Sequence, residues 1–334
     1  MSVKHAAPTY AALLPTEGDM TSAVDVAPYP GPAAAAHRRR RLPGWGRMFL
    51  GGAALWAATV LTTFATGNVN LVPTIILLGS FLVPVTFVVY AFGRTDGVLT
   101  AQRIFTAFVC GGVLGVLGAS VLEAALLRQP SLAGYAGVGL IEEAVKLAAL
   151  WLLARRLPRY TARDGIVLGA AVGFGFAALE SAGYAFTALF TPDGLSLLSV
   201  VETEALRAAL APVGHGLWTA ILGGALFATA ARSRRGRPRL TGALAGWYLL
   251  VALLHALWDA ASGIAVWLTL LLTGTPMQWR LIRLGEAPGV TEVQVHVYTL
   301  LNWGLLAYVG LVGVLILWAR WRRATAYDWS GGRL

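Results

Sequence analysis

The sequence is short of charged residues. Only 13% of its 334 residues are Asp, Glu, Lys or Arg, against about a quarter in soluble globular domains. One cysteine, Cys110, excludes an internal disulfide framework and a cysteine-rich metal motif. The zinc-protease pattern His-Glu-x-x-His is absent. Together with 57% hydrophobic residues, these shortages exclude an ordinary soluble domain and predict an all-α polytopic membrane protein.

Eight segments have the length of about 20 residues that a helix needs to cross a membrane. The predicted spans are 48–67, 71–92, 104–127, 134–154, 165–190, 208–231, 240–267 and 298–320. The spans place a membrane helical domain at 48–323, and the longer loop at about 268–297 is expected to hold an interfacial helix. Residues 1–47, rich in alanine and proline, and residues 324–334 are predicted to be cytoplasmic tails, the first of them disordered.

The basic residues predict the orientation of these spans. They lie in short runs between hydrophobic segments, for example Arg232–Arg239, so the net charge of +10 does not indicate a nucleic-acid partner. When loops are assigned alternately to the two sides, four basic residues fall on one side and most of the rest on the other. The positive-inside rule therefore predicts that both termini are cytoplasmic. The outer four are Arg128, Arg207, Arg280 and Arg283.

A few ionisable side chains lie deep inside the predicted spans, where each costs about 2.5–3.5 kcal/mol on insertion scales. Those of interest are Glu142, Glu143, Lys146, Glu180, His215, His255 and Asp259. They come from four different spans, and at 1.5 Å per residue all fall about 10–18 Å below the outer edge. A shared depth favours one common site over scattered stabilising pairs.

Helical spacing predicts which of these side chains meet. Lys146 follows Glu142 by four residues and Glu143 by three, so it can neutralise one acid and leave the other to react. An acid held in apolar surroundings is a stronger base. His255 and Asp259 are also four residues apart. The alternatives are a structural ion pair and a hydrogen-bonded histidine pair without catalytic role.

A row of glycines occupies one face of the span 165–190. The row comprises Gly165, Gly169, Gly173 and Gly183. Small residues at this spacing let another helix approach closely.

Four sequence elements together resemble the PrsW family of intramembrane proteases, which is distantly similar to CAAX prenyl proteases and bacteriocin-processing membrane proteases. The elements are EEAVK (142–146), FAALESAGY (176–184), the lone His215 and HALWD (255–259). They occur in order over about residues 134–262, and the first three spans and the last carry no such motif. Ser181 stands where many members have Asn.

The resemblance implies an activity and a location. It implies that the protein hydrolyses a peptide bond of a membrane-protein substrate, within or near the bilayer. The part of the chain expected to do this is a protease-like core at about 134–267. Family members are linked to cleavage of single-pass proteins such as anti-sigma factors. The expected location is the bacterial plasma membrane, where the chain would be a multi-pass protein.

The shared depth and the spacing of the site residues lead to a hypothesis for their roles. Glu142 or Glu143 would be the general base on water, with Lys146 neutralising the other acid. His215 and His255 would stabilise the oxyanion, or bind a divalent metal such as zinc.

Two residues would support the histidines. Glu180 would be the third metal ligand or a second acid–base group. Asp259 would orient the ring of His255.

Two other classes of function stay open at this point. Acids and histidines inside a membrane also form proton relays, so a proton-coupled transporter is possible on composition, although no clear internal repeat occurs. A non-enzymatic membrane scaffold with a vestigial site is the other alternative.

Overall fold

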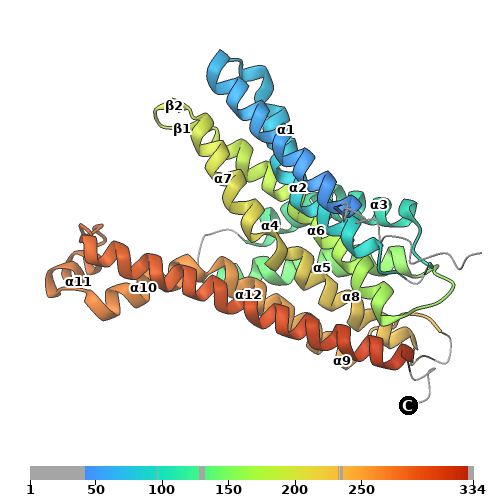
Figure 1. Cartoon of the computed structure of the whole chain (residues 1–334). Helices are drawn as coiled ribbons and strands as arrows, with labels where there is room; N and C mark the ends of the chain where they lie inside the picture. Colours follow the sequence, from blue (N-terminus) through green and yellow to red (C-terminus); the bar gives the residue numbers. More distant parts are fainter. Residues whose placement is uncertain (1–41, 96, 128–131, 232, 234–235, 330–334) are drawn as a thin grey trace, which may run out of the picture. The chain divides into compact units, whose positions relative to one another are not determined.

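The structure, a computed structural model, describes residues 42–95, 97–127, 132–231, 233 and 236–329 (Figure 1). The longer helices are α1 (Gly44–Thr66), α2 (Val72–Phe92), α5 (Leu132–Ala154), α6 (Ala162–Ala188), α7 (Leu197–Leu210), α8 (His215–Ala231), α9 (Gly242–Asp259), α10 (Ala261–Thr273) and α12 (Glu292–Trp329). The shorter ones are η1 (Val69–Leu71), α3 (Ala101–Val109), the π-turn η2 (Cys110–Leu114), α4 (Gly115–Leu126), η3 (Ala211–Val213) and α11 (Pro276–Arg283). Within the described residues, the strands are one antiparallel pair, β1 (Phe190–Thr191) and β2 (Gly194–Leu195). The predicted all-α class is confirmed.

Threonines set the start of four helices. In each case the hydroxyl oxygen accepts a hydrogen bond from the backbone N–H three residues later, which satisfies one of the unpaired donors of the first turn. The capping residues are Thr100 for α3, Thr161 for α6, Thr241 for α9 and Thr275 for α11. At α11 the cap is reciprocal, because Gln278 accepts from the N–H of Thr275 in turn.

Among the described residues, seven helical segments are long and apolar enough to cross a membrane. They are Gly44–Thr66, Val69–Phe92, Ala101–Leu126, Ala162–Ala188, Leu197–Ala230, Gly242–Asp259 and Glu292–Thr325. The remaining predicted span, 134–154, coincides with α5, a helix of 23 residues that carries three ionisable side chains in its middle. The chain is therefore a multi-pass membrane protein, and its orientation stays a prediction.

Two predicted boundaries are wrong. Residues 191–207, expected to be an outer loop, contain the β1–β2 turn and most of α7, which begins after Ser196 caps the N–H of Ser199. The predicted span 240–267 is two helices, because the chain breaks at Ala260 between α9 and α10.

Other predictions concern the ends of the domain. The helix expected in 268–297 is present as α11. The last helix, drawn in red in Figure 1, runs from Glu292 to Trp329, well beyond both ends of the predicted span. Most of the predicted N-terminal tail, 1–41, and the final residues 330–334 lie outside the described residues.

The central helix α6 packs against α8 without intervening side chains. A Cβ at Gly165, Gly169 or Gly173 would collide with a backbone carbonyl oxygen of α8, that of Gly223, Thr219 or His215 respectively. The predicted close approach is thus confirmed for three of the four glycines. The fourth, Gly183, faces open space. This contact fixes the position of His215 relative to α6.

Candidate active site

Four mutually contacting helices supply the predicted site residues. Helix α5 contacts α6, α8 and α9, and α8 contacts both α6 and α9. Helix α5 carries Glu142, Glu143 and Lys146, α6 carries Glu180, α8 begins at His215, and α9 carries His255 and Asp259. The structure joins all seven side chains into one network of polar contacts.

The ammonium group of Lys146 lies at the centre of this network. Its Nζ atom is 2.9 Å from Oε2 of Glu142, 3.0 Å from Oε1 of Glu143 and 2.8 Å from Nδ1 of His215. The side chain is fully buried, and Nζ also lies 3.9 Å from the ring centroid of Phe176. A buried ammonium has three N–H donors that need partners, and these three acceptors supply them.

The two adjacent acids have different surroundings. Glu143 is fully buried, and its Oε1 contacts both Lys146 and Nδ1 of His255, the latter at 3.0 Å. Its Oε2 is buried without a hydrogen-bond partner among the described residues. The side chain of Glu142 is 8% exposed, and its Oε2 faces Lys146. Of the two, Glu142 is therefore the acid that water can reach.

His255 is held from both sides of its ring. Nδ1 faces Glu143, and Nε2 lies 3.3 Å from Oδ2 of Asp259 and 3.6 Å from Oε2 of Glu142. The indole of Trp218 lies against the ring, with centroids 4.7 Å apart. The contact between His255 and Asp259 is the one that their spacing along α9 predicts.

His215 connects Lys146 to Glu180 and, through it, to an arginine that sequence reasoning missed. Nε2 of His215 is 2.9 Å from Oε2 of Glu180, and that oxygen also pairs with Arg207 of α7. Arg207 Nε donates to Oγ of Ser181 at 2.7 Å, so the residue that departs from the family pattern has a partner. Arg207 falls in a segment that hydropathy predicts to be an outer loop. The apolar spacing of residues 197–210 could have revealed the helix that carries it.

Three of these residues could hold a metal ion. Ligand atoms of Glu142, His215 and His255 all lie within 4.8 Å of one another. Two histidines and one carboxylate are a known ligand set of catalytic zinc. The hydrogen bond between Glu143 and Nδ1 of His255 leaves Nε2 facing the group, as in metal sites where a carboxylate orients the ligand. Glu180, the predicted carboxylate ligand, is outside this set and contacts His215 and Arg207 instead.

The fold and the site define an all-helical integral membrane protein with a buried carboxylate–histidine centre suited to hydrolysis. Comparison with known families agrees: the description "PrsW family intramembrane metalloprotease" matches residues 45–282, and the chain belongs to this family. It is therefore an intramembrane peptidase, which disfavours the transporter and scaffold alternatives. No curated protein and no solved structure matches the chain.

Proposed function

We propose that the protein hydrolyses a peptide bond of a membrane-protein substrate with a water molecule that Glu142 deprotonates. The observation that carries this proposal is the difference between the two adjacent acids, since the side chain of Glu142 keeps 8% of its surface exposed and that of Glu143 keeps none. Oε2 of Glu142 is engaged by Lys146, and Oε1 has no hydrogen bond to another described residue. Oε1 is thus the oxygen available to take the proton of water and deliver it to the leaving amine.

Lys146 and Glu143 hold the base in place. Lys146 fixes Oε2 of Glu142 through an ion pair at 2.9 Å. Glu143 balances the lysine charge and orients His255 through Nδ1. Neither side chain needs to contact the substrate, so both are positioning residues.

The two histidines lie where negative charge develops on the scissile carbonyl. His255, supported by Asp259, and His215, supported by Glu180 and Arg207, approach Glu142 from α9 and α8. In the described contacts the N–H of His215 donates to Glu180 and Nε2 of His255 faces Asp259, so either ring would stabilise an oxyanion by exchanging that carboxylate for the developing charge.

The same residues provide for a metal ion. Glu142, His215 and His255 would hold a divalent ion, for which we propose zinc. Such an ion polarises the carbonyl and makes water a better nucleophile. In the described structure Lys146 binds two of these three side chains, so loading the site would require the lysine to give up its contact with His215.

The substrate class follows from the family and from the place of the site. We propose a single-pass membrane protein, of the anti-sigma-factor kind, cleaved in a bacterial plasma membrane. For cleavage, an extended backbone segment of the substrate needs only to reach Glu142.

The test compares Glu142→Gln with Glu202→Gln in purified full-length protein acting on a membrane peptide. Glu202 is an exposed acid of α7 with no place in the network. Loss of a positioned base lowers kcat by about 10²–10⁴-fold, so Glu142→Gln should lose activity by that factor and Glu202→Gln should keep it. Full activity of Glu142→Gln would refute the proposal.

Metal content distinguishes the two ways of stabilising charge. Near-stoichiometric zinc in the wild type, lost in His215→Ala/His255→Ala, would establish these histidines as ligands. Full activity without metal would assign them to the oxyanion alone.

A further inference from the structure

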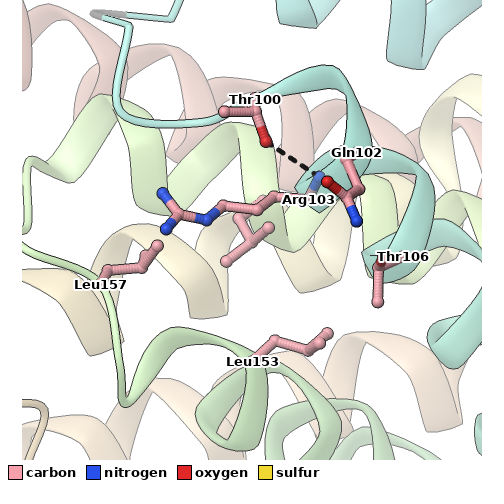
Figure 2. A pocket seen from close by; sticks show the side chains of 7 residues that line it. Thr100, Gln102, Arg103, Thr106, Leu153 and Leu157 are labelled. Carbon is pink, nitrogen blue, oxygen red and sulfur yellow. Dashed lines mark hydrogen bonds between the residues drawn. The ribbon is translucent and has the colours of Figure 1, made fainter.

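Two pockets lie at the end of α5, about two helical turns beyond Lys146. Leu157, three residues beyond the end of the helix, lines both. The first pocket, of about 370 Å³, is shown in Figure 2, and the second is larger, about 550 Å³. Neither pocket contains a residue of the catalytic network.

The first pocket joins polar groups of α3 to leucines of α5 and α6. Figure 2 shows the guanidinium of Arg103 extending toward Leu157, with Thr100 and Thr106 beside it. Nη1 of Arg103 donates to the carbonyl of Val98 at 2.7 Å, which fixes the side chain and uses one of its five N–H donors. The first pocket therefore combines the positive charge of Arg103 with an apolar surface formed by leucines.

The second pocket gathers positive charge. Its lining includes Arg155, Arg156 and Arg237, all exposed, and no acidic residue. Trp151, 38% exposed, lies one turn before Arg155 on α5. Three arginines around one hollow repel one another unless an anion lies between them, and their planar guanidinium groups suit the oxygens of a phosphate.

The local backbone that carries the arginines is firmly anchored. The hydroxyl of Tyr160 and the N–H of Leu157 both donate to the carbonyl oxygen of Ala154, at 2.8 and 3.0 Å, which satisfies the last turn of α5. The ring of Tyr160 packs edge-on against Phe227. Burial raises the pKa of the Tyr160 phenol, so the hydroxyl remains a donor at neutral pH.

We propose that the end of α5 is a binding site for the phosphate headgroup of an anionic phospholipid. The arginines of the second pocket would bind the phosphate, and Trp151 and Leu157 would contact the glycerol and the first acyl carbons. The apolar lining favours a lipid over free phosphate. The predicted cytoplasmic side also suits it, because anionic lipids attract basic residues there by about 1 kcal/mol each. A bound lipid would fix the end of the helix that carries Glu142 and Lys146.

The experiment titrates the purified full-length protein, in an uncharged detergent, with dioctanoyl phosphatidylglycerol and follows the midpoint of thermal unfolding. Dioctanoyl phosphatidylcholine and inorganic phosphate, at matched ionic strength, are titrated in parallel. A ligand that binds only the native state raises the midpoint in a saturable way. We expect this for phosphatidylglycerol alone, and an affinity about tenfold weaker or more in Arg155→Gln/Arg156→Gln.

The matched control is Arg280→Gln/Arg283→Gln. These two arginines are also exposed, lie in the last turn of α11, and line neither of the two pockets described above. The control should bind like the wild type. Equal weakening in both double variants, an equal response to inorganic phosphate, or no saturable response would each overturn the proposal. If the first double variant does not fold, Arg237→Gln takes its place with the same expectation of weaker binding.

Discussion

Lys146 and His215 are separated by 69 residues, yet Nζ of the lysine lies 2.8 Å from Nδ1 of the histidine. An ammonium group can only donate, so Nδ1 must accept. Nε2 then carries the ring proton and donates to Glu180 at 2.9 Å. Lys146 therefore determines the tautomer of His215 and also holds Oε2 of Glu142, which links two parts of the site through one side chain.

The first prediction concerns that lysine. Lys146→Met should abolish detectable cleavage and lower stability by about 3–5 kcal/mol, because removal of one partner leaves Glu142 and Glu143 as buried, uncompensated charges. Thermal unfolding in detergent and single-turnover cleavage measure the two effects. The double variant Lys146→Met/Glu143→Gln should recover much of the unfolding midpoint and none of the activity. An unchanged midpoint in the single variant would contradict the central place of the lysine.

Arg207 should matter for turnover and little for folding. Its side chain is 26% exposed, so Arg207→Ala leaves no large cavity. Glu180 would lose its ion pair and its fixed position on His215, and we expect kcat to fall about 10- to 100-fold, as for other groups that support an acid–base residue. KM should change little, and the pH–rate profile should shift. Arg207→Lys should not restore the rate, because a lysine cannot hold Glu180 and Ser181 at once.

The matched control for the arginine is Ser181→Ala. It removes the second acceptor of Arg207 and keeps the pair with Glu180. Its kcat should stay within about threefold of the wild type, because the ion pair that positions Glu180 is kept and only the hydrogen bond from Arg207 to Ser181 is lost. If the pH–rate profile of Arg207→Ala is identical to that of the wild type, Arg207 has only a structural role.

Two identical substitutions on α6 separate close packing from helix propensity. In Gly173→Ala the new methyl group would meet the carbonyl of His215, so α8 must shift and the histidine must move with it. We expect a loss of activity of about 10²-fold, the effect of a displacement near 1 Å at a catalytic group. Gly183→Ala adds the same methyl group to open space on the same helix. Gly183→Ala should cleave the substrate like the wild type. Comparable losses of activity in both variants would show that the loss does not come from the contact between α6 and α8.

A fourth prediction addresses α7, which carries Arg207. Ser80 of α2 donates to Oε1 of Glu204 at 2.7 Å, in a buried contact between the two helices. Ser80→Ala should lower stability by about 1–3 kcal/mol, since it leaves a buried carboxyl oxygen without its partner. Thr59→Ala, at a half-buried threonine of α1 whose hydroxyl bonds only the carbonyl of Leu55 in its own helix, serves as the control and should be close to neutral. Thermal unfolding in one detergent measures both.

The clustering of the candidate site residues could be predicted from the sequence because their types and spacings are unusual in apolar segments. EEAVK and HALWD each place an acid one turn from a base, and one turn is what the contacts Glu142–Lys146 and His255–Asp259 require. Which of the two acids, Glu142 or Glu143, is the better candidate for the general base could not be predicted. It depends on which side of α5 faces His255, and that follows from tertiary packing.

The failures have a common physical cause. Hydropathy assigned residues 191–207 to a loop because α7 contains Glu202, Glu204 and Arg207. Two of these side chains have polar partners on other helices: Glu204 accepts a hydrogen bond from Ser80, and Arg207 forms an ion pair with Glu180. Pairing across 27 or 124 residues is invisible to a local hydropathy average.

The glycine contact between α6 and α8 has a consequence for how the protein tolerates change. Where two backbones touch, their separation is set by covalent geometry, and no neighbouring side chain can repack to alter it. Substitutions elsewhere in the interior can therefore accumulate without moving His215 away from Glu180. The sequence around this pair is free to diverge, whereas Gly165, Gly169 and Gly173 are not.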